Sequence, residues 1–113
     1  MTQPINHMAA QLLLSEIELI RAQLRDPALE KHEIKTLRSD LKRKLVAASI
    51  LTGMEGEIRN VGVAWRIQSE SNPETFYMAS ADYCSCDAGM NGRQCKHMEA
   101  ARALEMCKNM ILA

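Results

Sequence analysis

Three cysteines and one histidine lie close together near the C-terminal end of the chain. They form Cys84-Ser85-Cys86 and, after eight intervening residues, Cys95-Lys96-His97. Thiolate sulfur and imidazole nitrogen are the ligands that zinc takes in tetrahedral structural sites. Four protein ligands complete the coordination shell, so no position remains for a substrate water. We therefore expect one structural Zn²⁺ per chain, bound by Cys84, Cys86, Cys95 and His97.

Other states of these cysteines stay open at the level of sequence. The thiols could be free around a core histidine, or Cys86 and Cys95 could form a labile disulfide. The sequence has no apolar core of a signal peptide, so we expect a reducing compartment, where metal binding or free thiols are commoner than disulfides. Oxidation would eject a bound metal, which leaves a thiol redox switch open. Cys107, outside the cluster, is predicted to be a buried small hydrophobic residue, and His7 and His32 to be surface residues.

The elements that must position the cluster follow from hydrophobic periodicity. Residues 61–67 alternate between apolar and polar, which predicts a half-buried strand in which Trp65 points inward. Residues 69–75 contain Asn-Pro and predict a hairpin loop, and residues 76–80 predict a second strand. Residues 96–111 have helical periodicity, with Ala100, Leu104, Cys107 and Ile111 on one apolar face. The first cysteine pair therefore follows a strand, and Cys95 and His97 begin a helix.

This order of strand, hairpin, strand, C-x-C, loop, C-x-H and helix resembles the SWIM-type zinc finger over residues 61–103. Cys84-Ser85-Cys86 and Cys95-Lys96-His97, continuing into Met98-Glu99-Ala100, are similar to its signature. The resemblance implies that Cys84, Cys86, Cys95 and His97 bind zinc within a ββα unit. It also implies an accessory domain that binds DNA or protein, as in chromatin remodellers, transposases and recombination factors. We find no G-x-S-x-G or Walker motif and no pair of carboxylates in a plausible cleft, so we expect no enzymatic activity.

The first half of the chain has helical periodicity and resembles no family. Apolar residues recur at spacings of three and four over residues 5–25 and 27–52. They are Met8, Leu13, Ile17, Ile20 and Leu24 in the first segment, and Ile34, Leu37, Leu41, Leu45 and Ala48 in the second. Asp26 and Pro27 predict the start of the second helix, and Gly53 its end. The stripes are narrow, so the helical hairpin could close on itself or form a homodimer.

We therefore predict an α+β fold of two parts. Residues 1–53 form the helical hairpin, and residues 54–113 form a SWIM-like ββα zinc-binding unit. Residues 53–60 contain two glycines and form the expected flexible joint between them.

The charges of the chain sum to zero, with 14 Lys plus Arg and 14 Asp plus Glu, so binding of nucleic acid would need a local patch. Residues 28–53 carry six basic and three acidic side chains. On an ideal helix, four of the basic residues fall within a sector of about 60°. The candidate phosphate contacts are Lys31, Lys35, Arg38, Lys42 and Arg43, with assistance from Arg93 and Lys96. The alternative is a solvated flank whose charges steer helix pairing, with Arg93 and Lys96 balancing the charge of the metal centre.

Two functions fit these features. The first is an accessory or regulatory protein that binds DNA through the basic helix flank. The second is a protein adaptor or inhibitor that docks a partner through the hairpin, with zinc purely structural. No run of about 20 apolar residues exists, so no membrane partner is expected. We expect a cytoplasmic protein, located in the nucleoid or nucleus if it binds DNA, and not a secreted one.

Overall fold

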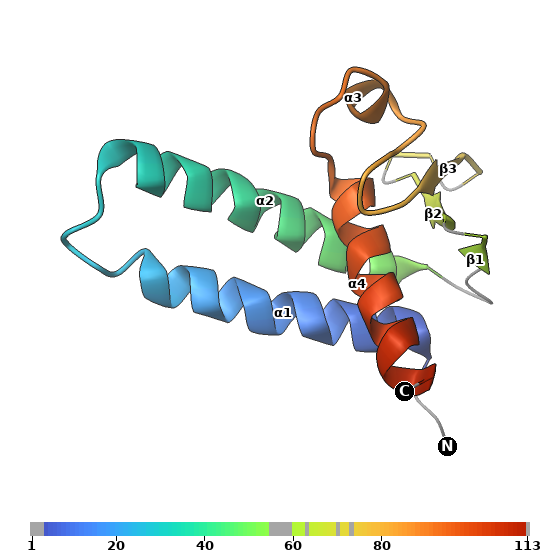
Figure 1. The fold of residues 1–113 in the computed structure, drawn as a ribbon, viewed down its shortest axis with the longest axis horizontal. Coiled ribbons are helices and arrows are strands. Elements are labelled where there is room, and N and C mark those ends of the chain that lie inside the picture. The colour runs from blue at the N-terminus through green and yellow to red at the C-terminus, as the bar shows by residue number, and fades with distance from the viewer. Residues whose placement is uncertain (1–3, 55–59, 63, 70, 73, 113) are drawn as a thin grey trace.

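A computed structural model describes residues 4–54, 60–62, 64–69, 71–72 and 74–112. Its elements are α1 (Ile5–Gln23), α2 (Lys31–Gly53), β1 (Asn60–Val61), β2 (Ala64–Gln68), β3 (Phe76–Ala79), α3 (Asp87–Met90) and α4 (Lys96–Leu112). Figure 1 shows α1 and α2 as an antiparallel pair, with α4 crossing them at one end and the sheet and α3 beyond it. The fold is α+β with an N-terminal helical pair, as predicted. Among the described residues, no helix combines the length and the apolar character needed to cross a membrane.

The junction of the hairpin differs from the prediction. The second helix begins at Lys31 and not at Pro27. The Asp26 side chain accepts a hydrogen bond from the backbone N–H of Ala28 at 2.9 Å, so it closes a local turn and does not cap a helix. Residues 24–30 therefore form the connection, and Glu30 precedes the helix without a side-chain cap.

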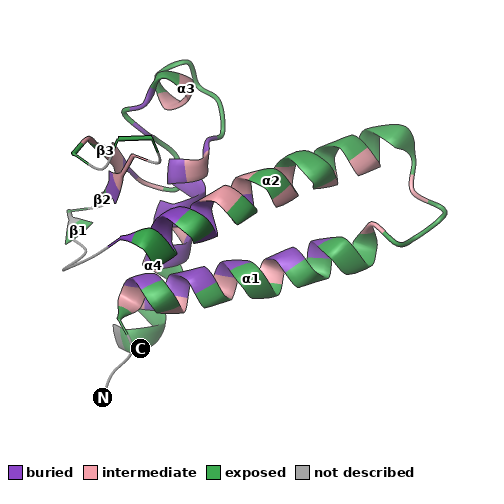
Figure 2. Ribbon diagram, turned by 180° about the vertical axis from the view of Figure 1, so that it is seen from behind, coloured by how far each residue is buried: buried purple, intermediate pink, exposed green. Residues whose placement is uncertain are grey.

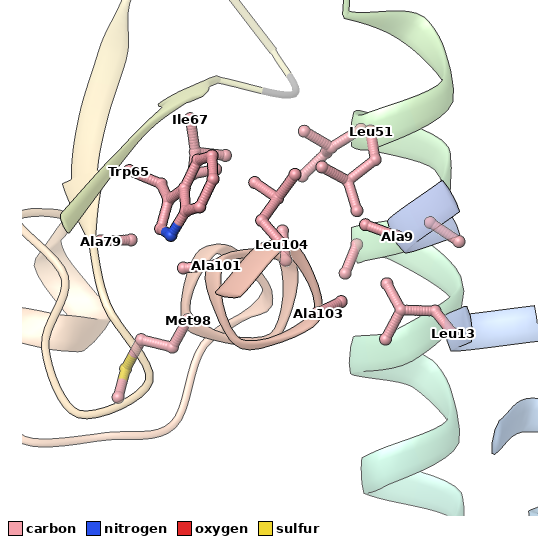
Figure 3. Packing of buried hydrophobic residues seen from close by; sticks show 14 of the residues in the cluster. Ala9, Leu13, Leu51, Trp65, Ile67, Ala79, Met98, Ala101, Ala103 and Leu104 are labelled. Atoms are coloured by element: carbon pink, nitrogen blue, oxygen red, sulfur yellow. The ribbon is translucent and has the colours of Figure 1, made fainter. Parts of the chain in front are cut away.

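The hydrophobic core is centred on α4. Ala100, Ala101, Ala103 and Leu104 are completely buried on this helix. Figure 3 shows Ala9, Leu13 and Leu51 of the hairpin on one side of α4, and Trp65, Ile67 and Ala79 of the sheet on the other. These residues belong to a single cluster of buried side chains. The last helix, α4, thus packs against both α1 and α2.

The buried face of α2 also differs from the prediction. Its buried residues are Lys44, Ala47, Ala48, Ile50 and Leu51. Of the predicted apolar stripe only Ala48 is buried, whereas Leu45 is 40% exposed and Ile34, Leu37 and Leu41 are half-buried. The reason is that α4 covers only the end of the hairpin farthest from the 24–30 connection, and exposed residues dominate the other end (Figure 2).

Of the apolar residues predicted for the first helix, Leu13, Ile17 and Ile20 are buried on α1 and Met8 is half-buried, whereas Leu24 is half-buried just after the end of α1. On α4 the predicted apolar face is buried at Ala100, Leu104 and Cys107, but the prediction was wrong for Ile111, which is 56% exposed.

The sheet has three antiparallel strands in the order β1-β2-β3, one more than predicted. Trp65 pairs with Ala79 and Ile67 with Tyr77. Trp65 and Ile67 are buried while Arg66 between them is exposed, so the predicted alternation is confirmed over β2. Gly62 has a φ of +63°, which allows the tight turn from β1 to β2. Most of the predicted joint falls on residues 55–59, outside the described residues.

Candidate metal centre

The four predicted ligands lie on three segments: the chain after β3, the residue before α3, and the beginning of α4. Cys84 follows β3 and forms a bridge with Ala79, and Cys86 precedes α3. Cys95 precedes α4, and His97 lies in its first turn. All four side chains are buried, and their ligand atoms lie within 4.8 Å of one another. The structure therefore brings together the set that the sequence pattern singles out.

The donor set and its spacing fit a metal ion. With a zinc–sulfur bond of about 2.3 Å and a zinc–nitrogen bond of about 2.0 Å, a sulfur and a nitrogen ligand of a tetrahedron lie about 3.5 Å apart. The Cys95 Sγ and His97 Nδ1 atoms are 3.9 Å apart. All four cysteines of the chain are free, so the alternative disulfide between Cys86 and Cys95 is not formed. The cluster could hold a metal ion, and three thiols with one imidazole are a donor set that zinc takes in structural sites.

Backbone amides support each of the three sulfur atoms. The N–H of Gly89 donates to the Cys86 sulfur at 3.4 Å, and the N–H of Met98 donates to the Cys95 sulfur at 3.5 Å. The N–H of Cys86 donates to the Cys84 sulfur at 3.5 Å. Such donors stabilise negative charge on sulfur and orient metal ligands. The loop backbone is therefore arranged for thiolates.

Burial acts against ionisation of the same thiols. It raises the pKa of Cys84 and Cys95 above the ordinary value. Burial also opposes ionisation of Cys86, but the N–H of Gly89 and the neighbouring thiols outweigh it and lower the pKa of Cys86. Three buried thiolates without a cation would be costly, whereas a bound divalent cation favours the deprotonated form of each. The electrostatics of the cluster thus suit a cation.

Gly89 makes the tight wrap of the loop possible. A Cβ atom at this position would lie 2.7 Å from the Cβ atom of Cys84 and would also overlap the Cys84 carbonyl oxygen. Only a residue without a side chain allows this approach. Gly92 has a φ of +74° and turns the chain back toward Cys95.

The flanking strand holds the cluster from the other side. The Ser85 N–H donates to the Met78 carbonyl at 3.0 Å, and the Ser85 hydroxyl accepts from the Met78 N–H at 3.0 Å. The Tyr77 ring lies 4.7 Å from the His97 ring, centroid to centroid, at an interplanar angle of 42°. This packing limits the rotation of the imidazole.

The predicted phosphate contacts fall into two groups. Lys31, Lys35, Arg38 and Lys42 are exposed, and within the described ranges no ion pair to them is found. Arg43 differs, because it forms an ion pair with Asp40 at 3.5 Å. Near the metal centre, Arg93 is exposed and Lys96 is half-buried.

Sequence reasoning missed a group of buried and half-buried charges, which we call the interhelix ion cluster: Glu16 of α1, Lys44 of α2, and Glu99 and Arg102 of α4. Lys44 pairs with Glu99, with Glu16 at 3.3 Å and, within α2, with Asp40 at 3.6 Å. Arg102 pairs with Glu99 at 3.0 Å and with Glu16 at 2.5 Å. Although burial opposes ionisation, Lys44 and Arg102 lower the pKa of Glu99. One signal was available, since Lys44 shares a helix face with Ala47, Ala48 and Leu51.

Comparison of the chain with known protein families, with curated proteins and with solved structures finds no match in any of the three.

Proposed function

We propose that this chain is a non-catalytic, zinc-stabilised module, similar to a SWIM-type finger, that binds the phosphate backbone of DNA through α2. The zinc ion, bound by Cys84, Cys86, Cys95 and His97, would fold the C-terminal part. Metal binding energy is folding energy where no preformed site exists in the unfolded chain.

A row of exposed cations, which we call the basic row, carries the proposal. It consists of Lys31, Lys35, Arg38 and Lys42. At about 1.5 Å per residue, the row extends over about 16 Å along the helix. Duplex DNA carries one phosphate per about 1.7 Å of its axis, so several phosphates come within reach of four side chains.

The position of the row supports the same function. At about 100° per residue, the row lies about 180° around α2 from the centre of the face that contains Lys44, Ala47 and Leu51. It therefore points away from α1 and α4. The beginning of α2 also extends beyond α4, and only α1 runs beside it there (Figure 1), so a rod-shaped ligand on the side of α2 opposite α1 would not meet α4.

A specific observation favours a second candidate, docking of a protein. Ile34 lines a surface groove of about 390 Å³ together with Lys31, Lys35 and Arg38. Leu45 lies on the same side of α2 and is 40% exposed. An apolar floor with a basic rim would suit an amphipathic helix with acidic flanks.

The salt dependence of DNA binding tests the first candidate. The logarithm of the affinity falls with the logarithm of salt concentration with a slope of about −0.9 per phosphate contacted, so four contacts give about −3.6. Fluorescence anisotropy with a labelled 20-base-pair duplex measures this slope. We expect Arg38→Gln to reduce the slope by about 0.9. Arg21→Gln is the matched control, because Arg21 is paired with Glu18 on α1, and it should leave the slope unchanged.

Two results would reject DNA binding through the basic row. One is no binding at low salt by zinc-loaded protein, and the other is an equal slope for Arg38→Gln and Arg21→Gln. Saturable binding of an acidic amphipathic peptide, weakened by Ile34→Ser, would then favour the protein-docking candidate.

A further inference from the structure

The first two turns of α4 connect the metal centre with the helical hairpin. His97 lies in the first turn, and Glu99 and Arg102 follow on the same helix. Glu99 contacts Lys44 of α2, and Arg102 contacts Glu16 of α1. Only Met98 thus separates a candidate metal ligand, His97, from Glu99 and its ion pair to the hairpin.

The interhelix ion cluster is mostly withdrawn from water. The side chains of Lys44 and Glu99 are each 10% exposed, and those of Glu16 and Arg102 are 26% and 28% exposed. A buried charge is tolerated only while its partners stay in place, and removal of one partner is strongly destabilising. Lys44 also pairs with Glu16 and with Asp40 of its own helix, and Glu99 is the most buried of these three partners.

Apolar contacts also connect α4 with the hairpin. Leu104 lies two residues beyond Arg102 and is completely buried between the hairpin and the sheet (Figure 3). Displacement of the start of α4 would separate Glu99 from Lys44 and would withdraw α4 from Leu13 and Leu51. Each change exposes or isolates groups on the hairpin.

We propose that metal occupancy and the packing of the hairpin on α4 are one coupled equilibrium, transmitted by the interhelix ion cluster. Loss of the metal releases the beginning of α4, which leaves Lys44 without Glu99 and loosens α1 and α2 where α4 covers them. This coupling crosses the predicted boundary between residues 53 and 54. Where the basic row serves as proposed above, the metal also regulates the surface that binds DNA.

The reciprocity of coupled equilibria supplies the test. If metal binding stabilises the packing of the hairpin on α4 by some factor, that packing must strengthen metal binding by the same factor. A substitution that disturbs the packing must therefore weaken metal affinity. Zinc affinity is measured by competition with a chromogenic chelator, without DNA. We expect Lys44→Met to weaken zinc binding at least about tenfold, since it removes one partner of a buried pair. Lys42→Met is the matched control, because the same substitution falls on the exposed side of the same helix, and its affinity should stay within about twofold.

A second pair of variants covers the case in which Lys44→Met fails to fold. Glu16→Gln keeps the shape of the side chain but removes the charge that pairs with Lys44 and Arg102. We expect it to weaken zinc binding, whereas Glu18→Gln, on the exposed side of α1, should not. Equal zinc affinities within each pair would overturn the proposal.

Hydrogen exchange of the wild-type protein is the independent readout. On chelation of zinc, the amides of residues 44–51 should lose protection together with those of α4. Retained protection in residues 44–51 while α4 exchanges freely would also overturn the coupling. Since neither experiment contains DNA, failure of the coupling and failure of DNA binding are distinguishable.

Discussion

Replacement of Gly89 by alanine is expected to weaken the metal centre without touching a ligand. The added Cβ atom would lie 2.7 Å from the Cβ atom of Cys84 and 2.8 Å from its carbonyl carbon. Backbone atoms cannot rotate away as a long side chain can, so the loop itself must move. That movement also lengthens the hydrogen bond from the Gly89 N–H to the Cys86 sulfur.

The size of the effect follows from these two contacts. Overpacking of a tight site costs about 1–3 kcal/mol. Loss of a hydrogen bond to a charged group costs about 1.5–3 kcal/mol. A combined loss of about 3 kcal/mol, at about 1.4 kcal/mol per factor of ten, corresponds to about a hundredfold weaker zinc affinity. Competition with a chromogenic chelator measures this affinity. Thermal unfolding at saturating zinc measures the accompanying loss of stability.

Gly53→Ala is the matched control for this substitution. Gly53 is the last residue of α2, and among the described residues outside its own stretch of chain no atom lies within 4 Å of the position that its Cβ atom would take. The control should bind zinc as the wild type does. If Gly89→Ala also binds zinc with wild-type affinity, the close packing of the loop over Cys84 is wrong, and so is the role of the Gly89 amide.

Two further predictions concern the core on α4. Leu104→Ala should lower the free energy of unfolding by about 2–5 kcal/mol because Leu104 is completely buried. Met110→Ala, at a side chain that is 59% exposed, should change it by at most about 0.5 kcal/mol. Urea unfolding of zinc-loaded protein compares them, and equal effects would contradict the packing of α4. Burial raises the pKa of the Cys107 thiol, which is 1% exposed, so iodoacetamide should leave Cys107 unmodified in zinc-loaded protein. Mass spectrometry reads the modification, and rapid alkylation of Cys107 would show that this part of the core is open.

Periodicity predicted most of the elements, and the departures have local causes. The alternation around Trp65 predicted β2, and the three-and-four spacing predicted α1, α2 and α4. The predicted start of α2 was wrong because the Asp26 side chain can accept a hydrogen bond from a turn amide as readily as from a helix amide. The predicted buried face of α2 was wrong because burial on this helix depends on where α4 crosses it. No local sequence pattern contains that information.

The candidate site was more accessible to sequence reasoning than its surroundings. Cys84 and His97 could be grouped from residue type and spacing alone, and the structure places them in one cluster. The partnership of Lys44 with Glu99 could not be found in this way, because 55 residues separate them. Charged residues on helices are mostly solvated, so only the tertiary arrangement identifies those that are buried.

The end of the hairpin that α4 leaves uncovered has a consequence for how the chain could vary in length. No part of the metal centre lies near the 24–30 connection (Figure 1). Insertion of seven residues in each helix there would lengthen the hairpin by about 10 Å and would nearly preserve the rotational phase of both helices. The length of the hairpin is therefore independent of the geometry of the four candidate metal ligands. A chain of this design could be adapted to longer or shorter partners by whole turns of helix.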